Sequence, residues 1–305
     1  MRNALMKSLF ELAQHDTNVM LLTGDLGFGV FEKFEEAFPG QFLNVGVAEQ
    51  NMMGVATGLA LEGKKIFTYS IGNFPSLRCL EQIRNDACYH ELNINIIASG
   101  GGFSYGALGM SHHATEDLAI MRALPGVTVV APCTPEEAGE ATRQIISVPG
   151  VGYLRIDKSS ACEPDSPPEF ILGKSRTLRE GKDFTIMVSG GIAEEVMAAS
   201  VKLSELGIEC KVLSIHTLKP IDKEAIISAC QDTRGIMTVE EHTLIGGLKS
   251  AVNESCSDLS VYPEHSLHMG INDHYVETVG SQGFLRNKLS ISGSDIVESI
   301  LKIFA

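Results

Sequence analysis

One acidic residue, Glu49, stands at the start of a segment that is otherwise apolar and small. Residues 50–60 combine methionine, valine, leucine and alanine with Gly54 and Gly58, a pattern that predicts a buried helix close to other backbone. A carboxylate there costs free energy unless something requires it. Two interpretations follow: Glu49 satisfies free backbone N–H groups at the helix start, or it serves a site at an interface.

A second group of residues able to do chemistry lies in the glycine-rich segment 98–127. It contains the pairs His112–His113 and Glu116–Asp117. Glycines let the backbone approach a ligand closely, and an imidazole can donate to a developing oxyanion and exchange protons near neutral pH. The glycines fail the G-x-G-x-x-G frame, and Ser111, His112 and Asp117 lack a nucleophile-elbow frame. A dinucleotide site and a hydrolase triad are therefore disfavoured.

The elements that must position these residues alternate between strands and helices. Strands are expected at 19–23, 42–44, 65–69, 95–98, 128–131 and 152–156, with helices between them, for example at 77–88 and 135–147. A polar stretch with prolines, 159–168, interrupts the rhythm before a second series, at 183–189, 193–206, 209–213, 222–230, 235–240 and 244–256. We expect two consecutive three-layer α/β/α domains with mostly parallel sheets, residues 1–165 and 181–305, joined by a linker over 166–180.

Composition narrows the class of protein. The 305 residues are 44% hydrophobic and carry a formal net charge of -14 with no lysine or arginine block, which argues against nucleic-acid or acidic-membrane partners. No apolar run approaches the roughly 20 residues of a membrane span, and the first residues predict an amphipathic helix rather than a signal peptide. Seven cysteines without a C-x-x-C pair favour reduced thiols, so a cytoplasmic location is expected.

The segment NVGVAEQNMMGVATGLA, residues 44–60, resembles the pyrimidine-domain signature of thiamine-diphosphate enzymes of the transketolase family. The resemblance implies that Glu49 bonds ring nitrogen N1′ of the cofactor's aminopyrimidine and moves a proton there, while the cofactor performs the carbon chemistry. The segment S-H-H-x-x-E-D resembles the family's loop with the active-site histidine. This implies that His112 contacts substrate oxygen near the reacting carbon, and that His113 supports it beside the substrate.

The turn after the third expected strand is similar to the family stretch that supplies an aromatic ring against the aminopyrimidine. Phe74 is the first choice for that ring and Tyr69 the reserve. The alternative for Phe74 is a plain core aromatic. Arg78 could bind an anionic substrate group, with a surface ion pair to Glu81 or Asp117 as its alternative.

Two positions bear on the substrate. Leu108 stands where the family has an aspartate that reads a sugar hydroxyl, and leucine cannot accept that hydrogen bond. The family's phosphate-reading arginine falls at Lys158, with Arg155 three residues earlier; a lysine holds phosphate as a point charge without the bidentate fork. Sugar phosphates are the expected substrates, and a modified ketose fits Leu108 equally well.

The family's pyrophosphate domain, with its G-D-G motif and downstream asparagine, is not matched by this sequence. Gly24 and Asp25 with Asn51 imitate the spacing, but Leu26 replaces the second glycine. We expect a separate N-terminal subunit to hold Mg²⁺ or Ca²⁺ and the diphosphate, in a heterotetramer whose core is a homodimer of this chain. Asp25 is expected near the cofactor or the subunit interface, and its alternative is a turn residue.

The second half resembles the transketolase C-terminal domain through VSGG at 188–191, HTLKPID at 216–222 and VEEHTLIGGL at 239–248. We expect a tight turn at Gly190–Gly191 rather than an anion site, and a subunit contact at 240–242 rather than a cluster that titrates together.

The resemblance implies transfer of a two-carbon ketol unit from a ketose phosphate to an aldose phosphate by the assembled complex, with the chain inactive or nearly so alone. One alternative is a decarboxylating enzyme subunit, similar to deoxyxylulose-phosphate synthase or to the beta chain of a 2-oxo acid dehydrogenase. A second, of another class, is a non-catalytic binding or regulatory chain.

Overall fold

The first domain is built on a seven-stranded sheet in which six strands are parallel. The computed structural model describes residues 1–305, and the sheet has the order β10-β5-β6-β4-β3-β1-β2. Its strands are β1 (Val19–Thr23), β2 (Phe42–Asn44), β3 (Lys65–Ile71), β4 (Ile94–Ser99), β5 (Val127–Val130), β6 (Val151–Ile156) and the antiparallel β10 (Thr217–Lys219). The expected alternation of strands and helices is confirmed.

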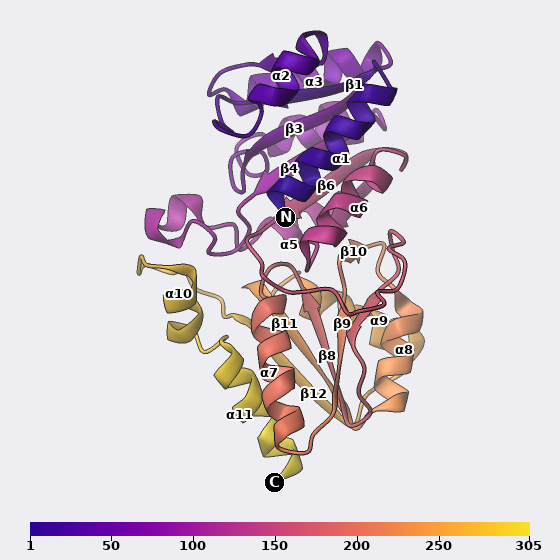
Figure 1. Cartoon of the computed structure of the whole chain (residues 1–305), viewed down its shortest axis with the longest axis vertical. Coiled ribbons are helices and arrows are strands. Elements are labelled where there is room, and N and C mark those ends of the chain that lie inside the picture. Colours follow the sequence, from indigo (N-terminus) through magenta and orange to yellow (C-terminus); the bar gives the residue numbers. More distant parts are fainter.

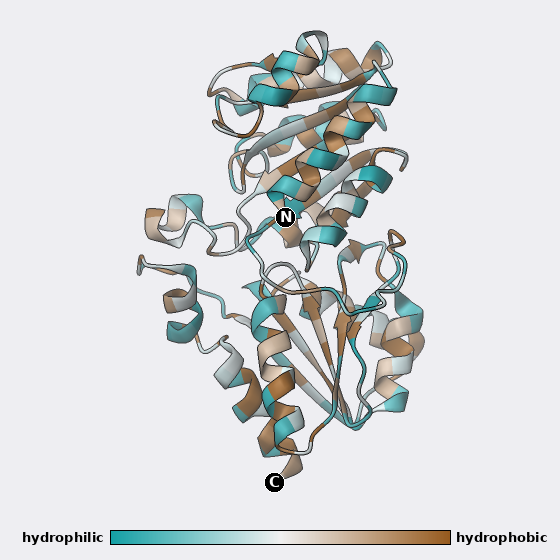
Figure 2. Ribbon diagram, in the orientation of Figure 1, coloured by the Kyte–Doolittle hydropathy of each residue, from teal (hydrophilic) through white to brown (hydrophobic).

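Helices cover both faces of this sheet, which explains why its central strands are apolar throughout. Successive residues of a strand point to opposite faces: Leu21 packs in one buried cluster with α1 (Arg2–His15), α2 (Glu32–Ala37) and α6 (Pro135–Ile145). Leu22 packs in another with α3 (Glu49–Leu61) and α5 (Asp117–Ala123). Figure 2 displays this pattern, with brown strands beneath helices that are teal on their outer faces.

The second domain repeats the three-layer plan below the first in Figure 1. Its five-stranded sheet has the order β12-β11-β8-β9-β7, with only β7 antiparallel. The strands are β7 (Arg176–Arg179), β8 (Phe184–Ser189), β9 (Cys210–Ser214), β11 (Gly235–Thr243) and β12 (His265–Ile271). The helices are α7 (Ala193–Glu205) and α11 (Gly293–Phe304) on one face, α8 (Lys223–Asp232) and α9 (Leu248–Leu259) on the other, and α10 (Gln282–Lys288). The predicted fold class is confirmed.

Four details differ from the sequence expectations. β7 lies inside the expected 166–180 linker, because its backbone pairs with β9 as an edge strand. β10 leaves the second half of the chain and pairs with β5 of the first sheet. The helix expected at 77–88 is a short α4 (Leu80–Gln82) continued by a π-helix over Ile83–Cys88, and the helix expected at 244–256 begins later, at Leu248.

The longest helix, α1, has 14 residues. None combines the length and the apolar character that crossing a membrane would require.

Candidate active site

The residues singled out by the sequence gather where β1, β2, β3 and β4 end. Because these strands are parallel, the loops that follow them meet at one edge of the sheet. Glu49 follows β2, Phe74 and Arg78 follow β3, and His112 follows β4. Ligand sites of open α/β sheets characteristically form at such an edge.

Glu49 is a buried carboxylate with one free oxygen. Its side chain is 1% exposed, and Oε2 accepts a hydrogen bond from Arg78 Nη1 at 2.8 Å. Oε1 is buried and has no hydrogen-bond partner. The first turn of α3 receives no side-chain cap, so the interpretation of Glu49 as a helix cap is wrong. The alternative given for Arg78, an ion pair with Glu81 or Asp117, is also wrong, because the turn after β3 places the guanidinium against Glu49.

Arg78, Phe74 and His112 continue from Glu49 in a contiguous row. The Arg78 guanidinium carbon lies 4.4 Å from the centroid of the Phe74 ring, a cation–π distance. The Phe74 and His112 ring centroids are 5.3 Å apart with an interplanar angle of 69°. Phe74 and His112 are half-buried, so both rings retain exposed surface. The structure thus brings together four residues that the sequence separates by 63 positions from Glu49 to His112.

Hydrogen bonds hold the loop that carries His112 at the residues on either side of it, Ser111 and His113. The Asn73 amide donates to the carbonyl of His113 and, at 3.5 Å, to that of Ser111. His112 Nδ1 lies 3.0 Å from Ser111 Oγ, which leaves Nε2 for other contacts. His113 is 3% exposed and packs edge-on against Phe103 at 5.0 Å. Burial lowers the pKa of His113, so this ring favours its neutral form beneath the loop.

The burial of His113 contradicts its expected place beside the substrate, and two further predicted residues lie away from the site surface. Tyr69 is 4% exposed, and its ring packs against Phe31 at a centroid distance of 4.8 Å, so it belongs to the core. Arg155 is 1% exposed, between Asp117 at 3.3 Å and Asp157 at 3.4 Å. A substrate group cannot reach this guanidinium, which corrects the expectation that Arg155 binds substrate.

Asp25 lies in the loop after β1, at the same edge as Glu49. Asn44 Nδ2 donates to Asp25 Oδ1 at 3.1 Å, and Asn44 Oδ1 accepts from the Asp25 backbone N–H at 2.9 Å. Asp25 has a φ of 57°, in the left-handed region that aspartate tolerates better than most residues. The preceding Gly24 lies against the Glu49 side chain, so this loop forms one wall around the carboxylate.

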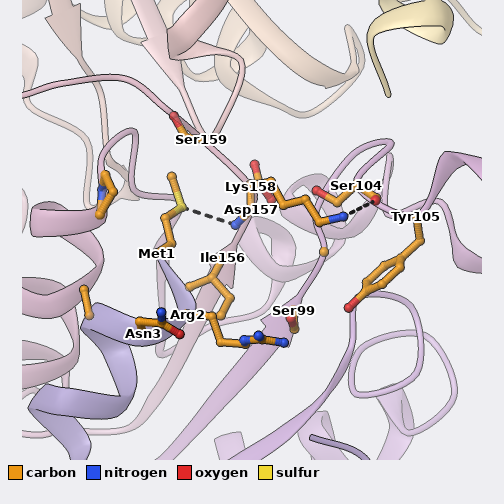
Figure 3. A pocket seen from close by; sticks show the side chains of 13 residues that line it. Met1, Arg2, Asn3, Ser99, Ser104, Tyr105, Ile156, Asp157, Lys158 and Ser159 are labelled. Carbon is orange, nitrogen blue, oxygen red and sulfur yellow. Dashed lines mark hydrogen bonds between the residues drawn. The ribbon is translucent and has the colours of Figure 1, made fainter. Parts of the chain in front are cut away.

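Lys158 lines a cleft of about 510 Å³ at the ends of β4 and β6. Arg2 and the N-terminus enter it from α1, and Ser99, Ser104 and Tyr105 come from the β4 end and the loop after it (Figure 3). The Lys158 ammonium lies 5.8 Å from the Tyr105 ring centroid and donates to the Ser104 carbonyl at 3.5 Å. Sequence reasoning missed Arg2, because an arginine in the first turn of an amphipathic helix has the pattern of a solvated residue.

Residues 240–242 are buried within this chain rather than exposed to another subunit. The Glu240 carboxylate accepts the Leu248 and Lys249 N–H groups at 2.6 and 2.8 Å, which caps α9. Glu241 and His242 face the first domain, so the expected subunit contact is wrong. The turn expected at Gly190–Gly191 is confirmed, and its Gly191 N–H donates to Asp157 Oδ2 at 2.8 Å.

Comparison with known proteins agrees with both halves of the chain. Residues 1–163 match the family model for the transketolase pyrimidine binding domain, and residues 173–279 match the transketolase C-terminal domain. A subunit of apulose-4-phosphate transketolase from Phocaeicola vulgatus is 36% identical over 84% of this chain and 83% of its own length. The SqwH subunit of 6-deoxy-6-sulfo-D-fructose transketolase from Clostridium sp. strain MSTE9 is 36% identical over 98% of this chain and 92% of its own.

A solved structure described as a split gene transketolase in an inactive beta4 tetramer superposes with a TM-score of 0.86 at 34% identity. The superposition covers 99% of this chain and 96% of that one. With two family models along its length and relatives of this similarity, the chain belongs to the transketolase family.

Proposed function

We propose that this chain is the C-terminal subunit of a two-chain, thiamine-diphosphate-dependent transketolase. Paired with a pyrophosphate-domain subunit, it would transfer a two-carbon ketol unit from a ketose phosphate to an aldose phosphate. The observation that carries the proposal is Glu49, whose Oε1 is buried without a partner while Oε2 is held by Arg78. A buried oxygen in this state costs free energy unless a ligand completes its hydrogen bonding.

The residues present fit the aminopyrimidine of thiamine diphosphate. A ring nitrogen needs a buried carboxyl oxygen, which Glu49 Oε1 supplies, and the ring needs an aromatic face. Arg78 covers one face of Phe74, so stacking would use the other. Asp25 lies in the adjacent wall and keeps its proposed place near the cofactor. When bound, thiamine diphosphate supplies the nucleophilic carbon of the reaction.

Glu49 and His112 have separate tasks in this proposal. Arg78 fixes the orientation of the Glu49 carboxylate through Oε2, so that Oε1 would be placed to hold a proton facing a bound aminopyrimidine. His112 Nε2 donates to a substrate oxygen as negative charge develops on it, because the Nδ1 side is turned to Ser111. His113, being buried, supports the loop beneath His112.

In this proposal, Arg2 and Lys158 bind the anionic end of the substrate. Two cationic side chains and a partly buried N-terminal amine enter the same cleft, a charge pattern suited to a phosphate or a comparable anion. Leu108, 57% exposed, offers no acceptor to a sugar hydroxyl. The names of the two relatives point to modified ketoses, apulose 4-phosphate and 6-deoxy-6-sulfofructose. We therefore propose an anionic ketose donor as the substrate class, with modified ketoses included.

Apolar residues around the site support a partner surface. Phe28 and Val47 are 77% and 71% exposed in the loops after β1 and β2, and nothing in this chain covers Gly54 and Gly58 of α3. Exposed apolar groups clustered beside a site favour a subunit contact. We propose that the pyrophosphate-domain subunit, carrying the Mg²⁺ or Ca²⁺ ligands, covers this edge in a heterotetramer. The inactive beta4 form of the solved relative supports the expectation that this chain alone has little activity.

The test is reconstitution with a pyrophosphate-domain subunit. The complex with thiamine diphosphate and Mg²⁺ should transfer a ketol unit between phosphorylated sugars, and this chain alone should not. Glu49→Ala should lower kcat by at least about 100-fold, the usual scale of a lost proton-transfer group. Glu62→Ala, at the exposed other end of α3, is the matched control. Full activity of Glu49→Ala, robust turnover by the chain alone, or acyl transfer from a 2-oxo acid in place of ketol transfer would contradict the proposal.

A further inference from the structure

The second domain contacts the base of the loop that carries His112. We call this base, formed by Gly102, Phe103 and Ala114, the neck of the loop. Residues 103–113 leave β4 and return through an antiparallel bridge between Gly102 and Ala114, with N–H···O distances of 2.8 and 3.1 Å. Directly at this bridge, the Phe103 N–H donates to Oε1 of Glu241, which extends from β11 of the other domain. A bond between sequence positions 138 apart thus fixes the point at which the loop begins.

Glu241 is itself rigidly placed. Its side chain is 2% exposed, Oε1 also accepts from Gln282 Nε2 at 2.9 Å, and Oε2 is paired with Arg286 Nε. Arg286 is equally buried and reaches Glu194 Oε1 at 2.6 Å. A carboxylate held by two partners in a dry environment has little freedom, and its charge strengthens the bond to the Phe103 amide.

The close approach at the neck has a steric signature. Gly102 has a φ of +55°, and a Cβ there would lie 2.3 Å from Glu241 Oε1. Any side chain at this position would collide with the carboxylate. Only a glycine lets the backbone at position 102 approach the Glu241 carboxylate this closely. The contact therefore depends on the residue type at position 102 as well as on Glu241.

The rest of the loop also leans on the second domain. The Phe103 side chain is fully buried in the hydrophobic cluster of that domain and carries His113 on its edge. Gly280 N–H donates to the Gly106 carbonyl at 3.3 Å, so the loop lies beside the segment leading into α10 (Figure 1). The path from Glu241 to the site is therefore short: Phe103, then His113, then His112.

We propose that Glu241, paired with Arg286, is a positioning residue that sets where His112 stands, and that this is a task of the second domain in the reaction. The proposal rests on the proposed function for the role of His112. The contact of Glu241 and Arg286 with the Phe103 amide, called the clamp below, does not depend on that function. It predicts that residues 103–113 are ordered in the chain alone.

The first test is hydrogen exchange on the full chain without its partner. Glu241→Ala should raise exchange of the Phe103 amide and of residues 103–113 by at least about 10-fold, since that amide loses its acceptor. Glu241→Gln, which keeps an acceptor for Phe103 but loses the charge pair, should lie between. Glu254→Ala is the matched control, because it removes another side-chain contact between the domains, to Arg122, and should leave this loop unchanged. Unchanged protection in a folded Glu241→Ala chain would overturn the proposal.

The second test uses the reconstituted complex. Glu241→Ala should lower kcat by about 10- to 100-fold, the scale of a misplaced catalytic group, with KM changed less than about 3-fold. In a His112→Ala background the same substitution should have no further effect on kcat, because both act through one imidazole. An equal loss in both backgrounds would overturn positioning in favour of a general structural role. An inactive wild-type complex would instead contradict the proposed function and leave the exchange result to decide the clamp.

Discussion

Removing Arg78 should destabilise the chain through the charge it leaves behind. In Arg78→Met the buried Glu49 carboxylate keeps its desolvation cost but loses its one hydrogen-bonding partner, since Oε1 already has none. Methionine keeps an apolar side chain of similar length but also removes the guanidinium from the Phe74 ring, so a second background is needed to separate the ion pair from this stacking.

The size of this effect follows from the exposure of the two partners. A hydrogen bond to a charged group contributes about 1.5–3 kcal/mol when buried, whereas an exposed ion pair contributes about 0–1 kcal/mol. Glu49 is 1% exposed but the Arg78 side chain is 47% exposed, so solvent screens one end of the pair. We expect a loss of about 1–2 kcal/mol in the free energy of unfolding.

Urea unfolding at pH 7 measures the loss, and a double-mutant cycle with Glu49→Gln assigns it. Once Glu49 is neutral, Arg78→Met should cost about 0.5–1 kcal/mol, the scale of the exposed cation–π contact with Phe74 that is lost in both backgrounds. Arg84→Met, a nearby arginine whose side-chain partner is the neighbouring Asn85, is the control. If Arg78→Met costs as much in the Glu49→Gln chain as in the wild type, the ion pair is not the cause and the argument fails.

Three further predictions concern the site and the core. His112→Ala should lower kcat of the complex by about 100- to 1000-fold with a smaller change in KM, as for a lost oxyanion donor; steady-state kinetics with saturating cofactor check this. Lys158→Ala should raise KM for an anionic ketose about 10-fold or more and leave KM for its uncharged analogue unchanged, as measured by comparing the two substrates. Burial lowers the pKa of His216 to about 3 in the folded chain, whereas the pKa in the unfolded chain is about 6.5. The contribution of neutral His216 to the free energy of unfolding is therefore fully present above about pH 6.5. That stabilisation should fall by about 2 kcal/mol by pH 5 and continue falling toward pH 3, and a pH series of urea unfolding should be flatter for His216→Phe.

The strands that the sequence predicts are those whose own residues determine them. β1 and β4 are short apolar runs buried on both faces, so local composition is enough. β7 alternates buried and half-buried residues at a sheet edge, and β10 is three residues long and ends at Lys219 before a proline. Both strands form because another segment of the chain supplies the backbone groups to which they hydrogen-bond. The residue pattern within one segment does not reveal that such a partner is present.

The site divides along the same line. Glu49, Phe74 and His112 follow strands at positions that motifs identify, and the parallel sheet then brings the strand ends together. Arg78 and Arg2 are harder to predict, because the partner of a long side chain depends on the path of a turn or the tilt of a helix. Arg155 shows the opposite error: the motif spacing suggested an anion reader, but two buried aspartates already surround its guanidinium.

An unpartnered buried oxygen and two exposed apolar side chains lie together at one edge of the first sheet. Glu49 Oε1 lacks a donor, and Phe28 and Val47 keep apolar surface in water. Each is a cost, about 1–3 kcal/mol for the unsatisfied buried oxygen alone, and each would disappear if a ligand and a covering subunit arrived together. At Glu241, by contrast, both carboxylate oxygens already have partners within the chain. Under the two proposals, contacts within this chain would set the geometry of the His112 loop, and binding of the cofactor and the partner subunit would close the Glu49 pocket.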